Sequence, residues 1–174
     1  MDIKEVLAAE QHHAGTPIVV VLIGLPGSGK SPVARSLGVP IVSRGCLRNV
    51  VGVTSVTETN LDYLEQVMVH GLLGAGHPVV VVDDHHTRNH YRRKWVSIAG
   101  AWHTVFLHMD TPISECKARR GRYPDVIPVI DKLVAAGEPV DAKEFAGLDR
   151  GSCSYYGSTD GGVSFAFKGR KVPR

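Results

Sequence analysis

The chain has 174 residues, 43% of them hydrophobic and 21% charged, and a formal net charge of +3. This length and composition are typical of one globular domain and argue against disorder or a membrane span, because the longest apolar runs are far too short to cross a bilayer. Three widely spaced cysteines without a C-x-x-C pair argue against a disulfide framework or a structural zinc site. The first residues do not resemble a secretory signal, so we expect a cytoplasmic protein.

Strand-like apolar runs alternate with segments of helical periodicity along the chain. In the first half we predict a helix over 2–10, a strand over 17–23, a helix over about 30–37, a short strand over 39–42 and a helix over 58–74. Next come a strand in "HPVVVVDD", a helix over 88–99, a strand in "WHTVFLHMD", and helices over about 112–119 and 125–136. This alternation predicts a three-layer α/β fold with a parallel sheet.

The C-terminal stretch 138–174 is rich in glycine, and "SYYGSTDGGVSFAFKG" predicts a β-hairpin around Asp160-Gly161-Gly162. Its aromatic residues are interleaved with basic ones, a pattern that allows stacking on bases but more often marks the packed face of a hairpin. We therefore expect one domain over 1–174, with a core over about 17–136 and an extension over about 138–174.

The segment "GLPGSGKS" at 24–31 fits the pattern G-x-x-x-x-G-K-[ST], with an apolar strand before it and a helix after it. Its glycines let consecutive backbone N–H groups point inward at the positive end of a helix, which makes a nest for phosphate. Lys30 would reach the β- and γ-phosphates of ATP, and Ser31 would offer its hydroxyl to Mg²⁺. The predicted phosphate-binding residues are Gly24, Pro26, Gly27, Ser28, Gly29, Lys30 and Ser31.

Pro32 follows this loop directly. Proline is sterically welcome in the first turn of a helix, but it has no N–H to give to a phosphate. The residue at this point of such loops usually donates to the α-phosphate, so the loss removes one hydrogen bond to a charged acceptor, worth about 1.5–3 kcal/mol at most. We predict weaker nucleotide binding with phosphoryl transfer retained.

Asp83 and Asp84 end the apolar run "VVVV". A phosphate loop acts together with an acid at the end of a neighbouring strand, which holds the metal or receives the proton of the attacking hydroxyl. A strand-end aspartate also serves as a helix cap or turn residue, but two acids in a chain with a phosphate loop favour a catalytic role.

Four segments together resemble the polynucleotide-kinase-like branch of P-loop kinases, typified by phage enzymes that phosphorylate the 5′-hydroxyl of nucleic-acid ends. They are "GLPGSGKS" at 24–31, "VSRGCLR" at 42–48, "VVVDDHH" with "YRRKW" within 80–95, and "ECKARRGRYPDVIP" at 115–128. The resemblance covers about residues 17–136 and implies a P-loop NTPase fold with a helical lid. It also implies Mg²⁺-dependent transfer of the ATP γ-phosphoryl to a hydroxyl of a nucleic acid, with DNA as the expected partner, in the host cytoplasm if the chain is phage-encoded.

The resemblance also implies roles for individual residues. By position, Arg48 corresponds to the residue that holds an acceptor phosphate, and Asp84 to the strand-end acid. We assign Arg44 and His86 to the acceptor side as well.

The lid arginine that reaches the ATP phosphates corresponds to Arg119, Arg120 or Arg122. The spacing does not single one out; we favour Arg122 and then Arg119. With these, the expected catalytic set is Lys30, Asp84, Asp83, Arg122 and Arg119.

The chain departs from the family at Gly45. The family reads N-R-D-D-x-R, in which the first Asp is the general base, whereas this chain reads "SRGCLR" from Ser43 to Arg48. Either Asp84 or Asp83 accepts the proton instead, or the acceptor is held differently. Because positioning and charge stabilisation dominate phosphoryl transfer, losing a base slows the reaction without abolishing it.

Three functions remain open from the sequence. The first is a nucleic-acid kinase, acting on a 5′-hydroxyl end or on the hydroxymethyl group of a modified pyrimidine that is flipped out of DNA. The second is a P-loop kinase for a small acceptor such as a nucleoside or sugar. The third is a catalytically weakened nucleotide-binding module, suggested by Pro32 together with Gly45.

Overall fold

The computed structural model describes residues 1–52, 57–140, 151–158, 160 and 164–171. The elements of its first half are α1 (Ile3–Ala14), β1 (Ile18–Ile23), α2 (Lys30–Ser36), β2 (Ile41–Val42), α3 (Arg44–Val51), α4 (Glu58–Gly74) and β3 (Val79–Val82). Those of its second half are α5 (Asn89–Ser97), β4 (His103–Met109), α6 (Ile113–Arg120), α7 (Val126–Ala136), β5 (Ser152–Ser158) and β6 (Ala166–Lys171).

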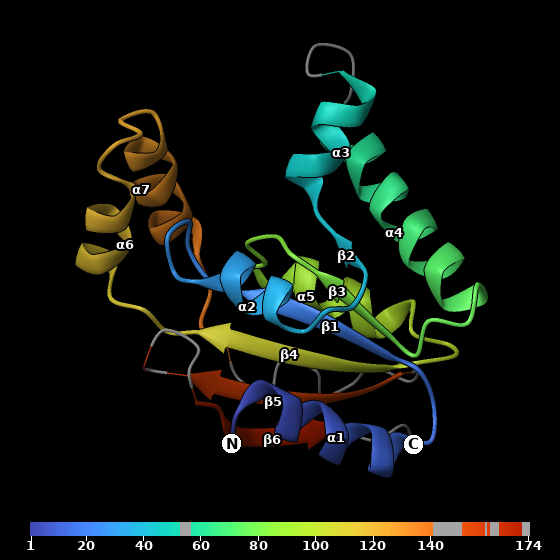
Figure 1. The fold of residues 1–174 in the computed structure, drawn as a ribbon. Helices are drawn as coiled ribbons and strands as arrows, with labels where there is room; N and C mark the ends of the chain where they lie inside the picture. Colours follow the sequence, from blue (N-terminus) through green and yellow to red (C-terminus); the bar gives the residue numbers. More distant parts are fainter. Residues whose placement is uncertain (53–56, 141–150, 159, 161–163, 172–174) are drawn as a thin grey trace.

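The six strands form one sheet in the order β2-β3-β1-β4-β5-β6 (Figure 1). Neighbouring strands run parallel, apart from the antiparallel pair β5 and β6. Every residue of β1 is buried, which explains its unbroken apolar sequence, because both faces of a parallel sheet are covered by helices.

Helices cover both faces of the sheet. On one face, Leu61 of α4 and Trp95 of α5 pack in one core with Val19 of β1. On the other, Val6 of α1 packs in a second core with Val20 of β1 and residues of α2. Successive β1 side chains thus enter opposite cores, as the period of a strand requires. The predicted three-layer α/β fold with a parallel sheet, the P-loop NTPase fold, is confirmed.

The predicted helix over 58–74 coincides with α4, whereas the leading helix is longer than predicted. The Asp2 side chain accepts hydrogen bonds from the backbone N–H groups of Lys4 and Glu5 at 2.8 and 2.9 Å, which starts α1 at Ile3. The helix ends at Gly15, whose φ of 59° suits a glycine cap. The added residues, 11–14, are mostly polar, so the apolar periodicity that predicted the helix does not extend over them.

Helix α3 was not predicted. It lacks an acidic first turn, and Ser43 at its N-cap makes no side-chain capping hydrogen bond. Its buried residues are Arg44 and Leu47, so tertiary contacts hold it. This is the usual way in which packing overrides weak local preference.

The C-terminal strands join the main sheet. β5 pairs with β4 in parallel from His103 opposite Ser152 to Met109 opposite Ser158, and β6 returns antiparallel to β5. The predicted hairpin strands are therefore present, but the first of them extends the parallel sheet. Of the predicted turn, positions 161 and 162 lie outside the described residues.

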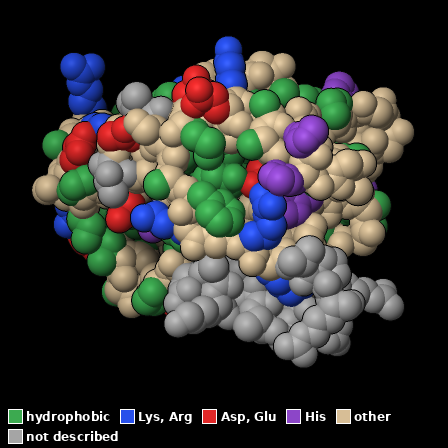
Figure 2. All heavy atoms as spheres, turned by 90° about the horizontal axis from the view of Figure 1, so that it is seen from below, with side chains coloured by type: hydrophobic (Ala, Val, Ile, Leu, Met, Phe, Trp, Pro, Cys, Tyr) green, Lys and Arg blue, Asp and Glu red, His purple; other side chains and the backbone are tan. Residues whose placement is uncertain are grey.

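Helices stand beside the carboxyl ends of the parallel strands. α6 and α7 lie on one side of these ends, and α3 with the start of α4 lies on the other (Figure 1). Figure 2 views the molecule from below, where α1 and β6 lie in Figure 1, and shows a strip of hydrophobic side chains near the centre of that face with histidine and basic side chains beside it. None of the described helices combines the length and apolar character needed to cross a membrane.

Candidate active site

The phosphate loop connects β1 to α2 and needs glycine at two close approaches. A Cβ on Gly24 (φ 148°) would lie 2.7 Å from Ser28 Oγ, and one on Gly27 (φ 86°) would lie 2.6 Å from the Cys116 carbonyl oxygen of α6. These clashes, and the positive φ angles, exclude larger residues at both positions. The loop therefore packs directly against α6.

Lys30 is almost fully buried within this loop, with 6% of its surface exposed. Its Nζ donates to the carbonyl oxygens of Gly24 and Leu25, each at 2.8 Å. Burial lowers the pKa of Lys30 to about 8, and the nearby Asp83 and Asp84 carboxylates limit this decrease. The geometry holds the ammonium group at the centre of the loop, where a phosphate would neutralise it.

A cleft of about 550 Å³ opens beside the loop. It is lined by loop residues, by α3, by the residues after β3 and by α6: Pro26, Gly27, Gly29, Lys30, Ser31, Pro32, Ser43, Gly45, Arg48, Asp83, Asp84, His85, Arg119 and Arg120. We call it the donor cleft. Of the predicted phosphate-binding residues, Gly24 and Ser28 do not line it; Ser28 is buried and has an unpaired hydroxyl.

A second cleft of about 520 Å³ adjoins the first. It is lined by Arg44, Arg48, Glu58, Asp84, His85, His86, Thr87, Arg88, Tyr91, Val129, Lys132 and Leu133. We call it the acceptor cleft. Arg48, Asp84 and His85 line both clefts, so the two spaces meet at these residues.

The two strand-end acids differ in position. Asp83 lines the donor cleft alone, whereas Asp84 lines both clefts. Burial would raise the pKa of Asp84, but the two following histidines and Arg44 outweigh it and hold that pKa below its usual value. Asp84 is therefore a carboxylate at neutral pH, placed at the junction.

Arg44 is held by acids on several sides. Its guanidinium lies 3.1 Å from Asp84 Oδ2, 2.5 Å from Asp62 Oδ1 and 3.3 Å from both Glu58 Oε2 and Glu65 Oε2. This side chain is largely buried and its charge is balanced by these carboxylates. Arg44 connects α4 to Asp84 and fixes the orientation of that carboxylate, and it also lines the acceptor cleft, where its binding of the acceptor stays a prediction.

His86 lines the acceptor cleft, and both of its ring nitrogens have partners within the protein. The ring is buried, its Nδ1 lies 2.9 Å from the Leu22 carbonyl oxygen, and its Nε2 accepts from Trp95 Nε1 at 3.0 Å. These partners require a neutral ring with the proton on Nδ1, and burial lowers its pKa to about 4. The ring thus anchors the loop after β3 to the core, and the role of His86 on the acceptor side stays a prediction.

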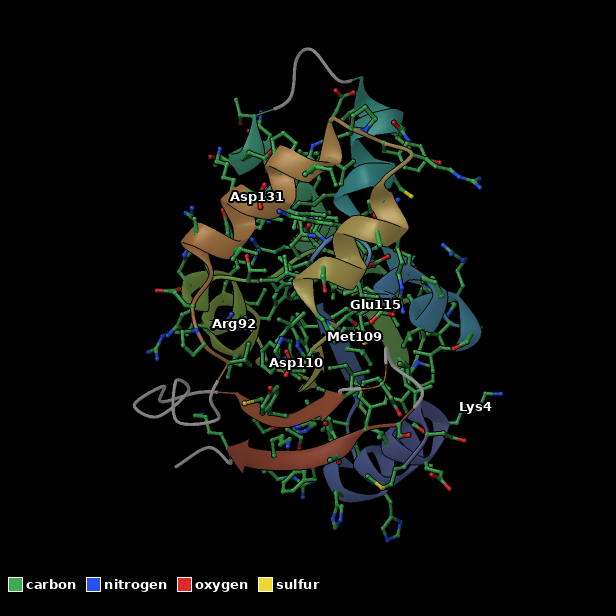
Figure 3. The ribbon with its side chains drawn as sticks, turned by 90° about the vertical axis from the view of Figure 1, so that its left-hand side faces the viewer. Lys4, Arg92, Met109, Asp110, Glu115 and Asp131 are labelled. Atoms are coloured by element: carbon green, nitrogen blue, oxygen red, sulfur yellow. The ribbon has the colours of Figure 1, made fainter. Side chains whose placement is uncertain are left out.

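Helix α6 brings two arginines to the donor cleft. Arg119 Nη1 donates to the Gly27 carbonyl oxygen at 3.1 Å, and Arg119 also pairs with Glu115 on the same helix. Arg120 lines the cleft beside it, whereas Arg122 lies beyond the end of α6 and lines neither cleft. Figure 3 shows α6, with Glu115 labelled, above Met109 and Asp110 at the end of β4.

Several cleft residues were not identified from the sequence. Arg88 is the N-cap of α5, Tyr91 lies in the first turn of that helix, and Lys132 lies on α7. The segment "YRRKW" lies on α5 and is part of the family resemblance, but only the fold shows that Arg92 is buried while Tyr91 lines the cleft. No local motif marks Lys132.

The fold and the loop are those of P-loop kinases. A model of the family described as "AAA domain" matches residues 19–123, and the chain belongs to this family. A search of curated proteins finds no match.

Solved structures share the fold. A chain in the structure of a Pnkp1/Rnl/Hen1 complex is 24% identical with a TM-score of 0.54, over 60% of this chain and 39% of that one. A second structure, of the Pnkp1/Rnl/Hen1 RNA repair complex, is 19% identical with a TM-score of 0.54, over 76% and 44%. A putative kinase from Chloroflexus aurantiacus is 14% identical with a TM-score of 0.51, over 68% and 75%. This chain thus spans less than half the length of the two Pnkp1-complex chains.

Proposed function

We propose that the protein is an ATP-dependent phosphotransferase that moves the γ-phosphoryl to a hydroxyl of a nucleic acid. The observation that carries the proposal is the meeting of two clefts at Asp84, with Lys30 and two lid arginines on the donor side. Such an arrangement brings a phosphoryl group and an acceptor to one point in a site lined by fixed charges, the main requirement of phosphoryl transfer.

Each cleft residue then has a role. Lys30, Arg119 and Arg120 stabilise charge on the migrating phosphoryl. The acceptor oxygen attacks the γ-phosphorus, the bond from that phosphorus to the bridging oxygen breaks, and ADP leaves. The hydroxyl proton passes to the Asp84 carboxylate, because Asp84 is the acid that lines both clefts. Its lowered pKa makes it a weak base, which suits a reaction in which the proton moves late.

The donor side also fits Mg²⁺. Ser31 and Asp83 line the donor cleft and carry the hard oxygen atoms that this ion prefers. In phosphate-transferring sites this ion usually keeps several waters and is held by one or two side-chain oxygens together with the substrate phosphates. When bound, Mg²⁺ neutralises charge on the phosphates.

The two aspartates supply the test. Asp84→Asn keeps the shape and removes the base, so we expect kcat to fall at least about tenfold with little change in the Kd for ATP. Asp83→Asn is the matched comparison, and it should raise the Mg²⁺ concentration needed for half-maximal activity. Full activity in both variants would contradict the assignment.

The acceptor could instead be a small molecule, because a cleft of about 520 Å³ has the size of a small-ligand site. Transfer to nucleosides or sugars, without salt-sensitive DNA binding, would favour that function. ATP binding without transfer to any acceptor would leave a nucleotide-binding module.

A further inference from the structure

His85 lies at the point where the two clefts meet. Its side chain lines both of them, a property that it shares only with Arg48 and Asp84 among the described residues. Those two side chains form ion pairs with neighbouring residues of α4 and α3. The imidazole of His85 is thus part of the site where a phosphoryl group and an acceptor would come together.

The backbone of His85 fixes the place of its ring. Its N–H donates to Asp84 Oδ1 at 2.7 Å, and its carbonyl oxygen accepts from the N–H of Gly24, the first residue of the phosphate loop, at 3.0 Å. The strands that lead to these residues, β3 and β1, are parallel neighbours in the sheet (Figure 1). His85 is therefore held against the start of the phosphate loop before any substrate binds, as a preorganised catalytic group must be.

The two ring nitrogens of His85 have different surroundings. Nδ1 is buried and has no hydrogen-bond partner within the described part of the chain. Nε2 is neither bonded to a described residue nor buried without a partner, so it is the ring nitrogen that reaches the clefts. His86 provides the contrast, because both of its ring nitrogens have partners.

These surroundings decide which nitrogen carries the proton. Burial and the Lys30 charge lower the pKa of His85, and the two preceding aspartates oppose this decrease only in part. The ring is therefore neutral at neutral pH, with one N–H donor and one acceptor nitrogen. A buried N–H without a partner is rarer and more costly than a buried acceptor without one. The proton is therefore on Nε2, and His85 directs a donor toward the junction of the clefts.

We propose that, within the proposed phosphotransferase reaction, His85 Nε2 donates a hydrogen bond to an oxygen of the migrating phosphoryl group. In the transition state, the charge of that group is spread over three equatorial oxygens. Donors then reach it from three elements: Lys30 from the phosphate loop, the two arginines from α6, and His85 from the residues after β3. His85 keeps its proton throughout, while Asp84 receives the proton of the hydroxyl.

Two substitutions separate a hydrogen-bond donor from other roles of the ring. His85→Gln retains an N–H donor near the position of Nε2, whereas His85→Leu has a similar volume and no donor. We expect kcat of His85→Leu to fall at least about tenfold, as the loss of one hydrogen bond to a charged group implies, with the Kd for ATP within about twofold. His85→Gln should keep kcat within about threefold of the wild type at each pH tested. His12→Gln, at an exposed histidine of α1, is the control.

The comparison of the two variants decides the inference. Equal losses of kcat in His85→Gln and His85→Leu would overturn it, because they would indicate that the ring accepts a proton or only packs. An unchanged kcat in His85→Leu would overturn it as well.

A binding measurement keeps the inference separate from the proposed function, which fails if ATP binds and no acceptor is phosphorylated. ADP with Mg²⁺ and aluminium fluoride imitates a migrating phosphoryl group, and mimics of a transition state bind more tightly than substrates. Aluminium fluoride should therefore tighten ADP binding to the wild type and to His85→Gln at least about tenfold more than to His85→Leu. Equal tightening in all three proteins, or none in the wild type, would overturn the inference.

Discussion

Gly45 stands at the position where the resemblance to polynucleotide-kinase-like enzymes places the general base. It lies in α3 and lines the donor cleft, and a Cβ there would meet only Ser43 Oγ, at an ordinary 3.6 Å. Gly45→Asp should therefore fit and raise kcat about tenfold or more, because a positioned base assists proton transfer. Steady-state kinetics of this variant and of Gly45→Asn, which has the same shape without the base, provide the test. Equal rates in the two variants would contradict it.

Pro32 lies in the first turn of α2 and lines the donor cleft. Pro32→Ala restores a backbone N–H that can bond to a phosphate, so we expect the Kd for ATP to fall about three- to tenfold, within the worth of a charge-assisted hydrogen bond. kcat should change little, since Lys30 is untouched. Calorimetric titration with ATP measures the change, and an unaltered Kd would show that Pro32 does not weaken ATP binding.

At the residue scale, the positions of the phosphate-loop side chains could be predicted from the sequence, whereas the surroundings of residues outside that motif could not. Lys30 and Ser31 follow from a pattern whose backbone geometry fixes them. His86 adopts a left-handed φ of 47°, which turns its ring into the core. A sequence does not reveal such a turn at a non-glycine residue. The ion pairs of Arg44 could not be predicted, because its acidic partners on α4 are 14 to 21 positions away in the chain.

At the scale of elements, α6 places Arg119 and Arg120 in the donor cleft and ends before Arg122. We expect Arg119→Ala and Arg120→Ala each to lower kcat at least about tenfold, since arginines beside a transferring phosphoryl carry much of its charge stabilisation. Arg122→Ala should change kcat less than about twofold, because Arg122 lines neither cleft. Single-turnover transfer from labelled ATP compares the three. A dominant effect of Arg122→Ala would favour the alignment with the related kinases over the geometry.

Elements with a strong period could be predicted, and those held by distant contacts could not. α4 shows apolar residues at helical spacing and was located correctly, while α3 depends on Arg44 and Leu47 being buried. The place of β5 beside β4 is likewise a long-range pairing that no local pattern encodes.

At the scale of the whole molecule, Glu10 connects the two ends of the chain. It is fully buried in α1 and accepts hydrogen bonds from Tyr156 Oη at 2.5 Å, Ser154 Oγ at 2.9 Å and Arg170 Nη2 at 2.6 Å. Burial would raise its pKa, but these bonds and His103 outweigh it and lower the pKa to about 2. A carboxylate with a lowered pKa stabilises the fold above its unfolded value of 4.5, and this contribution is lost as pH falls toward 2.

Glu10→Gln should remove this contribution. A shift of this size corresponds to roughly 3 kcal/mol in the free energy of unfolding, so the variant should be less stable at neutral pH and should lose less stability than the wild type between pH 4.5 and 2.5. Urea unfolding at several pH values measures both effects. Asp125→Asn, an exposed acid without a capping bond, is the control. Parallel pH profiles of wild type and Glu10→Gln would contradict the role of Glu10.

Transfer of label from γ-labelled ATP tests the central claim most directly. Protein, Mg²⁺ and labelled ATP are incubated with a panel of 5′-hydroxyl oligonucleotides, hydroxymethylpyrimidine DNA, nucleosides and nucleoside monophosphates. We predict label in a nucleic-acid or nucleotide acceptor with the wild type and none with Lys30→Ala, which removes the charge on the migrating phosphoryl. Transfer by Lys30→Ala at the wild-type rate, or ATP bound by the wild type without label in any acceptor, would contradict the account.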